Sequence, residues 1–126
     1  MNKQIINTEK APAPIGPYSQ SVLAGNTLYV SGQIAIDPTT GEVVKGDIRE
    51  ETAQVMKNLK NILMAADMDF SNVVKCSIFV GDMGNFSAIN EVYGQHFPKN
   101  PPARETVEVS ALPKYVNVEI SCIAIK

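Results

Sequence analysis

The stretch Pro101–Val109 reads PPARETVEV, and Val116–Ile120 downstream reads VNVEI. Both alternate polar and apolar residues, which is the period of a half-buried β-strand, and Leu112–Lys114 between them is typical of a turn. Two strands joined by so short a connection are expected to bring Arg104 close to Glu119. The proline pair keeps the chain extended and removes two N–H donors, so it fixes where the arginine leaves the backbone.

Arg104 and Glu119 carry the functional hypothesis. A guanidinium held in one place binds a carboxylate through two parallel hydrogen bonds, and a nearby glutamate can move protons. The alternative is a structural ion pair, which is the commoner arrangement for an isolated arginine and glutamate. Alternation places Arg104 and Thr106 on one face of the first strand and Glu119 on the outward face of the second. If the two polar faces coincide, these three side chains line one site.

The composition is that of an ordinary globular domain. The chain has 126 residues, of which 44% are hydrophobic and 19% charged, and its formal net charge is −2. We therefore expect one domain over residues 1–126, and the charge balance argues against nucleic acid as a partner. The N-terminus lacks a signal segment, and no apolar run approaches the roughly 20 residues of a membrane span, so we expect a cytoplasmic protein with no membrane partner.

Cysteine and histidine are too few for a metal site. Cys76 and Cys122 lie in apolar strand-like runs and His96 is the single histidine, so we expect two buried free thiols, with a disulfide as the less favoured alternative. The sequence contains no glycine-rich phosphate loop and no nucleophile elbow. We expect chemistry that needs neither a metal nor a cofactor.

The remaining segments predict an α+β domain. A capping pattern at Asp47 and an apolar stripe predict a helix over 47–66, and a second helix is expected over 86–97. With a strand near 4–6, a two-stranded hairpin over 22–31, a strand over 73–80 and the two final strands, the order is β-β-β-α-β-α-β-β. Two helices can cover only one face of a six-stranded sheet. We expect further copies of the chain to cover the other face, with sites between subunits.

Two positions upstream are further candidates for the site. Gly32 interrupts a strand directly after Ser31, which predicts a β-bulge or a close approach of the backbone to another group. Tyr18 ends the proline-rich segment Ala11–Gln20, which is expected to be an extended, ordered loop. Either the Tyr18 hydroxyl lines a pocket and offers a hydrogen bond, or Tyr18 is a half-buried aromatic residue whose hydroxyl is exposed to solvent.

Taken together, these segments resemble the RidA/YjgF family of reactive-intermediate deaminases. The resemblance extends from Ala11 to Ala124, and six blocks in the right order and spacing make it specific. The matching blocks are Ala13–Gln20, Ser31–Ile34, Asp37–Glu42, Asn58–Lys60, Pro102–Arg104 and Leu112–Pro113 with Val118–Ile120.

The resemblance implies a chorismate-mutase-like fold, with a six-stranded, mostly antiparallel sheet and two helices on one face, assembled as a homotrimer with clefts between subunits. It implies hydrolysis of 2-imino acids such as 2-iminobutanoate and 2-iminopropanoate to 2-oxo acids and ammonia. These imines arise from enamines that pyridoxal-phosphate dehydratases release. No cofactor is implied for this chain.

The family pattern also implies residue roles. Arg104 would anchor the substrate carboxylate, and Glu119 would orient water and relay protons, so these two are the catalytic candidates. Ser31 and Tyr18 would position the substrate, and backbone N–H groups near Gly32 would contact its carboxylate.

The chain departs from that pattern at two places. Thr106 stands where many bacterial members have cysteine, so covalent catalysis by a thiol is not expected there, although its hydroxyl or N–H can still bind substrate. Ser121-Cys122 stands where Glu-Ala is commoner in the family. This difference removes one carboxylate from the strand face that carries Glu119.

Other functions remain open at this point. The same cleft can hold a 2-oxo acid or a similar small carboxylate without turnover, as a binding or regulatory trimer. A translation inhibitor or ribonuclease is less favoured, because the chain is acidic and lacks a histidine pair or a basic patch. A chaperone-like surface activity is not decided by the sequence.

Overall fold

The computed structural model describes residues 2–126 as one six-stranded sheet with two α-helices. The strands are β1 (Lys3–Ile6), β2 (Ser21–Ala24), β3 (Thr27–Gln33), β4 (Val73–Val80), β5 (Ala103–Glu108) and β6 (Val118–Ile125), and the helices are α1 (Ile48–Ala65) and α2 (Phe86–Gly94). This is the predicted order of elements. No helix within residues 2–126 combines the length and the apolar character that crossing a membrane requires.

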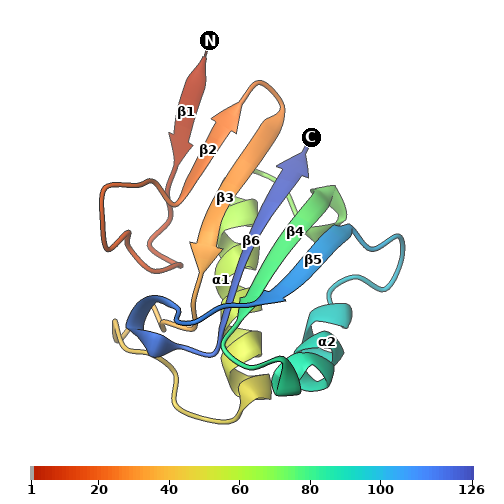
Figure 1. Cartoon of the computed structure of the whole chain (residues 1–126). Helices are drawn as coiled ribbons and strands as arrows, with labels where there is room; N and C mark the ends of the chain where they lie inside the picture. Colours follow the sequence, from red (N-terminus) through yellow and green to blue (C-terminus); the bar gives the residue numbers. More distant parts are fainter. Residues whose placement is uncertain (1) are drawn as a thin grey trace.

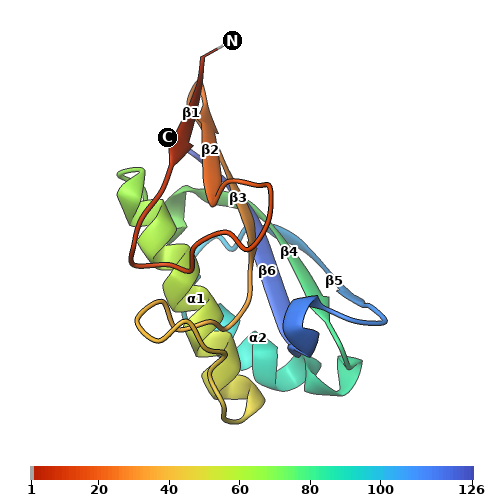
Figure 2. The same ribbon diagram turned by 90° about the vertical axis from the view of Figure 1, so that its left-hand side faces the viewer.

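The strands lie side by side in the order β1-β2-β3-β6-β4-β5. Every neighbouring pair is antiparallel except β4 with β5, which is parallel. Both helices lie behind the sheet in Figure 1, and the turned view in Figure 2 shows them on one side of it. The predicted α+β fold, with a mostly antiparallel sheet and both helices on one face, is therefore confirmed.

The core lies between the helices and the sheet. Alternate residues of β6 are buried against the helices, from Val118 through Ile120 and Cys122 to Ala124, as the alternation predicted. The apolar stripe of α1 packs on the same core. Cys76 and Cys122 are buried free thiols, as expected.

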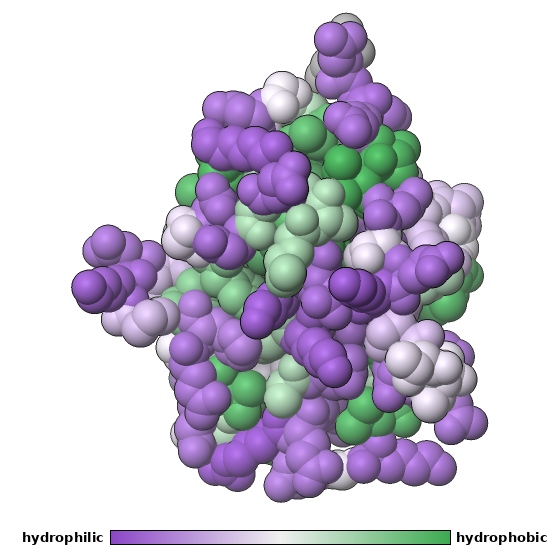
Figure 3. Space-filling model, turned by 180° about the vertical axis from the view of Figure 1, so that it is seen from behind, coloured by the Kyte–Doolittle hydropathy of each residue, from purple (hydrophilic) through white to green (hydrophobic). Residues whose placement is uncertain are grey.

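The opposite face of the sheet carries no α-helix within residues 2–126, although the N-terminal loop and the turn at Pro113 lie against it around Glu119. It exposes half of the surface of Tyr29 and 42% of that of Val107. Figure 3 shows the helix-bearing side, where hydrophilic residues surround smaller apolar patches. The predicted covering of the open face by further copies stays a prediction, because the structure contains one chain.

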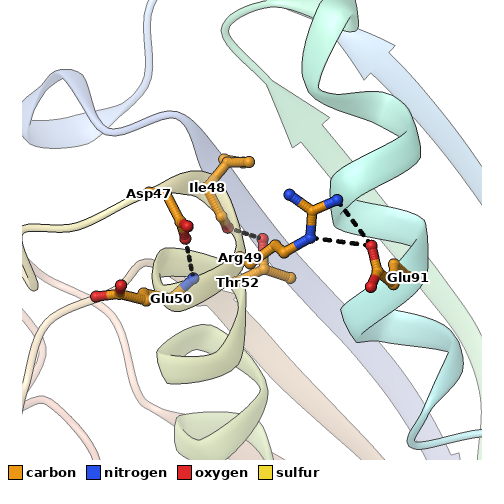
Figure 4. Close-up of polar contacts among 6 residues, drawn as sticks. All are labelled: Asp47, Ile48, Arg49, Glu50, Thr52 and Glu91. Carbon is orange, nitrogen blue, oxygen red and sulfur yellow. Dashed lines mark hydrogen bonds and ion pairs between the residues drawn. The ribbon is translucent and has the colours of Figure 1, made fainter.

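The start of α1 is fixed by its cap. The Asp47 carboxylate accepts a hydrogen bond of 2.9 Å from the N–H of Glu50, as predicted. An ion pair of 2.8 Å between Arg49 and Glu91 joins α1 to α2 (Figure 4). Both of its side chains are more than half exposed, so this pair contributes about 0–1 kcal/mol.

The second helix is shorter than predicted, because α2 ends at Gly94 rather than at Phe97. Glycine weakens the helix, and Pro98 disfavours a helical backbone at the residue before it. Phe97 is nevertheless buried, and its ring packs edge-on against Phe70 with the centroids 5.3 Å apart.

The predicted neighbourhood of the last two strands is wrong. β4 lies between β5 and β6, so the strands that carry Arg104 and Glu119 do not pair with each other. The connection through α2 returns the chain as a parallel strand beside β4. The apolar β6 occupies the centre of the sheet, and the more charged β5 becomes an edge strand, which is where charged side chains are tolerated.

Candidate active site

Glu119 borders a small pocket between β3, β6 and the N-terminal loop. The pocket has a volume of about 40 Å³, and its other lining residues are Pro12, Ala13, Ile15, Tyr18, Gln20, Gly32, Gln33, Ile34, Ile36 and Pro113. Partial burial raises the pKa of the Glu119 carboxyl above its ordinary value. This space suits one or two water molecules.

Gly32 makes room for Glu119. The pairing of β3 with β6 shifts register between Val30 and Gln33, which is the predicted bulge. A Cβ atom at position 32 would lie only 2.7 Å from Cδ of Glu119. The close approach predicted at Gly32 is therefore also present, and the approaching group is the carboxylate of the same chain.

The N-terminal loop is held in place by Gln20, which is buried. Its side-chain amide donates to the carbonyl oxygens of Thr8, Ala11 and Pro12, and its Oε1 accepts from the N–H of Thr8. This network keeps the proline-rich loop extended and ordered, as predicted. It also fixes the wall of the pocket to which Tyr18 belongs.

Tyr18 and Ser31 both lie at this pocket or beside it. The Tyr18 side chain is about half exposed, and its hydroxyl accepts a long hydrogen bond of 3.3 Å from the N–H of Ile15. The Ser31 hydroxyl donates to the carbonyl oxygen of Ser19 at 2.6 Å. In this chain the Ser31 hydroxyl therefore ties β3 to the loop, and its oxygen remains as an acceptor.

A larger hollow of about 530 Å³ lies against the other side of the same loop. It is lined by residues of the segment 5–20, including Tyr18 and Gln20, and by neither Glu119 nor Arg104. Its size alone does not make it the candidate site, because neither of the predicted catalytic residues lines it. Tyr18 lines both spaces.

Arg104 lies on the helix-facing side of β5, against α2. Its Nη1 donates to Oδ1 of Asn90 at 2.7 Å. Its guanidinium carbon lies 5.1 Å from the ring centre of Tyr93 and 5.6 Å from that of Phe86, distances at which a cation is attracted to an aromatic face. These contacts hold the guanidinium at the edge of the sheet.

The three α2 residues around Arg104 are spaced i, i+4 and i+7. That spacing puts Phe86, Asn90 and Tyr93 on one face of the helix. The sequence predicted this helix but did not indicate a role for Asn90. A polar residue within an otherwise buried helical stripe was the available signal.

Thr106 lies on the same face of β5 as Arg104. Among the described residues, the buried Oγ1 of Thr106 has no hydrogen-bond partner, and the buried hydroxyl of Tyr93 has none other than the thiol of Cys76. Burial raises the pKa of the Tyr93 hydroxyl, which therefore stays protonated. Unpaired buried polar groups are uncommon, and the Thr106 hydroxyl leaves hydrogen-bonding capacity beside the arginine.

The expectation that Arg104, Thr106 and Glu119 share one face is wrong. Arg104 pairs in register with Cys76, which is buried on the helix side, whereas Glu119 pairs with Phe79, whose side chain points to the other face. Cys76 and Phe79 are three positions apart on β4, an odd step, and side chains alternate along a strand. Within one chain, the arginine and the glutamate lie on opposite faces of the sheet.

The structure thus contains two separate groups. Tyr18, Gly32 and Glu119 line the 40 Å³ pocket, which we call the Glu119 pocket, and Ser31 lies beside it, bonded to the loop at Ser19. Arg104 and Thr106 lie with Asn90, Phe86 and Tyr93, which we call the Arg104 cluster. Within residues 2–126, no three acidic, cysteine or histidine side chains form a group that could hold a metal ion.

Comparison with known proteins identifies the family. The family model described as endoribonuclease L-PSP matches residues 8–126. The chain belongs to this family, which includes the RidA and RutC proteins, in agreement with the resemblance found in its sequence blocks.

Individual relatives match over almost the whole chain. A RutC family protein of Pyrococcus horikoshii is 53% identical over 124 residues, which are 98% of each chain. The 2-iminobutanoate/2-iminopropanoate deaminase of Homo sapiens is 48% identical over 98% of this chain and 90% of its own. The crystal structure of E. coli TdcF with bound serine superposes with a TM-score of 0.92 at 38% identity, covering 98% of both chains.

Proposed function

We propose that this chain hydrolyses reactive 2-imino acids, such as 2-iminobutanoate and 2-iminopropanoate, to 2-oxo acids and ammonia. We propose further that the site forms between copies of the chain in a homotrimer, with the Arg104 cluster of one copy facing the Glu119 pocket of another. The observation that carries this proposal is the placement of Arg104 and Glu119 on opposite faces of one sheet. The similarity to the human deaminase supports the reaction.

The Arg104 cluster has the chemistry of a carboxylate anchor. Asn90 occupies one nitrogen of the guanidinium, and the aromatic rings cover part of its surface. The remaining N–H donors are available for two parallel hydrogen bonds to a carboxylate. The Thr106 hydroxyl, which is buried without a partner in the chain, lies on the same side of the strand as Arg104.

The Glu119 pocket has the chemistry of a water site. A carboxylate whose pKa is raised by burial accepts a proton more readily than an exposed one. Glu119 would take a proton as water attacks the imine carbon, so that a C–O bond forms and the C=N π electrons move to nitrogen. Glu119 would give that proton to the nitrogen, which completes a carbinolamine, and would then transfer the hydroxyl proton to the nitrogen as the C–N bond breaks and the C=O bond forms. Ammonia and the 2-oxo acid are the products.

The test is a coupled assay with purified protein. A dehydratase acting on threonine or serine generates the imine, and the appearance of the 2-oxo acid is followed with and without this chain. We expect acceleration by the intact protein, and a loss of about 100-fold or more in kcat for Glu119→Gln, which keeps the shape of the side chain but removes its base. Acceleration absent with both substrates would contradict the proposal.

A second function has one observation in its favour. TdcF holds serine in its crystal, so a relative binds a small carboxylate, which supports a binding or regulatory trimer without turnover. If the intact protein binds 2-oxobutanoate in calorimetry yet does not accelerate imine hydrolysis, the binding function replaces the deaminase.

A ribonuclease, as the family description suggests, is less favoured because Asp and Glu outnumber Lys and Arg by 13 to 11 and the chain has one histidine.

A further inference from the structure

The inward face of α1 carries two buried polar side chains within its apolar stripe. Glu51 is 5% exposed and Asn58 is fully buried. They are seven residues apart, so they lie on the same face of the helix, two turns from each other. Buried polar groups require hydrogen-bond partners, and both find them outside the helix.

Glu51 binds the residues just before Glu119. Its Oε2 accepts from the N–H of Asn117 at 2.8 Å and from the N–H of Val118 at 3.2 Å. Its Oε1 accepts from Nδ2 of Asn117 at 2.8 Å. The carbonyl oxygen of Asn117 accepts in turn from the N–H of Gly81. The start of β6 is thereby fixed on both sides, one residue away from Glu119.

Asn58 binds the opposite wall of the Glu119 pocket. Its Nδ2 donates to the carbonyl oxygens of Ile34 and Ile36 at 3.1 and 3.0 Å. Its Oδ1 accepts from Nε2 of Gln54 at 2.9 Å, so the amide is oriented within its own helix. Ile34 and Ile36 line the pocket directly after Gly32 and Gln33.

The same helix face therefore holds both chain segments between which Glu119 sits. We propose that Glu51 is a positioning residue of the candidate active site, which fixes the start of β6 and through it the Glu119 carboxylate, and that Asn58 holds the facing wall. This inference rests on the proposed function. Glu51 forms these contacts as hydrogen bonds and not as an ion pair, because its partners are neutral N–H groups. Three N–H donors satisfy the buried carboxylate, and together they fix the backbone at the start of β6.

The chain offers matched variants for a test. Glu51→Ala removes both acceptors. Glu51→Gln keeps one oxygen for the two backbone N–H groups, and the Asn117 amide can turn to accept from the new NH₂. Thr52→Val is the control, because Thr52 is equally buried in the same turn of α1 but its hydroxyl bonds only to the carbonyl oxygen of Ile48 (Figure 4).

Imine hydrolysis by the folded variants is measured first, with folding checked by circular dichroism at the assay temperature. We expect Glu51→Ala to lower kcat about tenfold or more with KM within about twofold, because Glu119 is displaced while Arg104 is untouched. Asn58→Ala should act in the same direction. Glu51→Gln should recover most of the rate, and Thr52→Val should keep it.

A second readout does not depend on activity. The titration of the Glu119 carboxyl is followed by NMR, and amide hydrogen exchange is followed at Val118 and Glu119. In Glu51→Ala we expect the Glu119 titration to move toward the ordinary glutamate range and both amides to exchange faster, with neither change in Thr52→Val. If the intact protein lacks imine hydrolysis, the proposed function fails and this readout alone decides the role of Glu51. A folded Glu51→Ala protein with an unchanged Glu119 titration and unchanged exchange overturns the inference, as does one whose kcat equals that of the intact enzyme.

Discussion

The Glu119 pocket and the Arg104 cluster are built in different ways. The pocket depends on the backbone, namely the bulge at Gly32, the loop fixed by Gln20 and the start of β6. The cluster depends on side chains that one helix face presents to an edge strand. A group placed by the backbone is sensitive to small additions of volume, whereas a group placed by side chains is sensitive to the loss of single contacts.

The surroundings of the two charges also differ. Burial raises the pKa of Glu119, so its protein environment disfavours the ionised form. Arg104 is held by an amide oxygen and by aromatic faces, which favour a cation. The pocket therefore suits proton transfer, and the cluster suits the binding of an anion.

The largest expected effect comes from replacing the Arg104 guanidinium, which would bind the substrate carboxylate. In Arg104→Lys we expect kcat/KM for imine hydrolysis to fall by about 100-fold or more, because lysine keeps the charge but not the planar fork. Steady-state kinetics in the coupled assay measure this change. An Arg104→Lys protein with near-normal kcat/KM would show that a point charge suffices and that the planar fork is unnecessary.

Mixing two inactive variants tests whether the two groups come from different copies. Arg104→Ala and Glu119→Gln proteins are unfolded and refolded together at equal amounts. If each site takes its arginine from one chain and its glutamate from another, about one quarter of the sites regain both residues. Each variant refolded alone is the control. No recovery in the mixture, with mixed oligomers demonstrated by mass spectrometry, contradicts sites between copies.

Gly32→Ala sharpens the claim that the pocket is placed by the backbone. The added Cβ would lie 2.7 Å from Cδ of Glu119, so the carboxylate must shift, and we expect kcat to fall roughly 10- to 100-fold. The far end of this side chain can move, so the fold should persist in circular dichroism. Gly94→Ala is the control, since nothing lies within 4 Å of its added Cβ. It should leave kcat unchanged and stabilise α2 by up to about 1 kcal/mol.

Asn90→Ala tests the cluster by removing a single contact. We expect KM to rise roughly three- to tenfold with a smaller change in kcat, because Arg104 keeps its charge but loses one of the groups that orient it. Asn85→Ala is the matched control, as Asn85 precedes the same helix and its side chain makes no capping hydrogen bond. Equal kinetics for the two variants would remove Asn90 from the anchor.

The smallest expected effect is on stability. A raised pKa in the folded state means that ionisation of Glu119 destabilises the fold, so its contribution is favourable at low pH and is lost as the pH rises through the folded-state pKa. Glu119→Gln should therefore raise Tm by a few degrees at pH 7 and have almost no effect well below pH 4. Thermal unfolding at both pH values measures this difference. A Glu119→Gln protein that is less stable at pH 7 would mean that the carboxylate is stabilised by contacts outweighing its burial.

Much of the fold could be predicted from local patterns. The order of elements, the Asp47 cap, the bulge at Gly32 and the buried side of β6 all follow from residue periodicity and turn chemistry, and the structure confirms them. The helix end at Gly94 was missed because the apolar side chain of Phe97 continues the buried pattern beyond the last helical turn.

The candidate site was predicted residue by residue but not as an arrangement. Gly32 and Tyr18 do lie with Glu119, because strand, bulge and loop are adjacent in the sheet and the pocket. Asn90 and Glu51 were not identified, because each acts through a partner far away in the sequence, Arg104 in one case and Asn117 with Val118 in the other.

The sequence by itself determined which residues share a face within each strand, and it identified Arg104, Glu119 and Gly32 as the positions to examine. Only the tertiary structure decided that β4 separates β5 from β6 and that Arg104 and Glu119 look to opposite faces. The physical reason is that alternation along a strand is a local property. Which strands become neighbours, and in which register they pair, depends on which apolar faces are buried together.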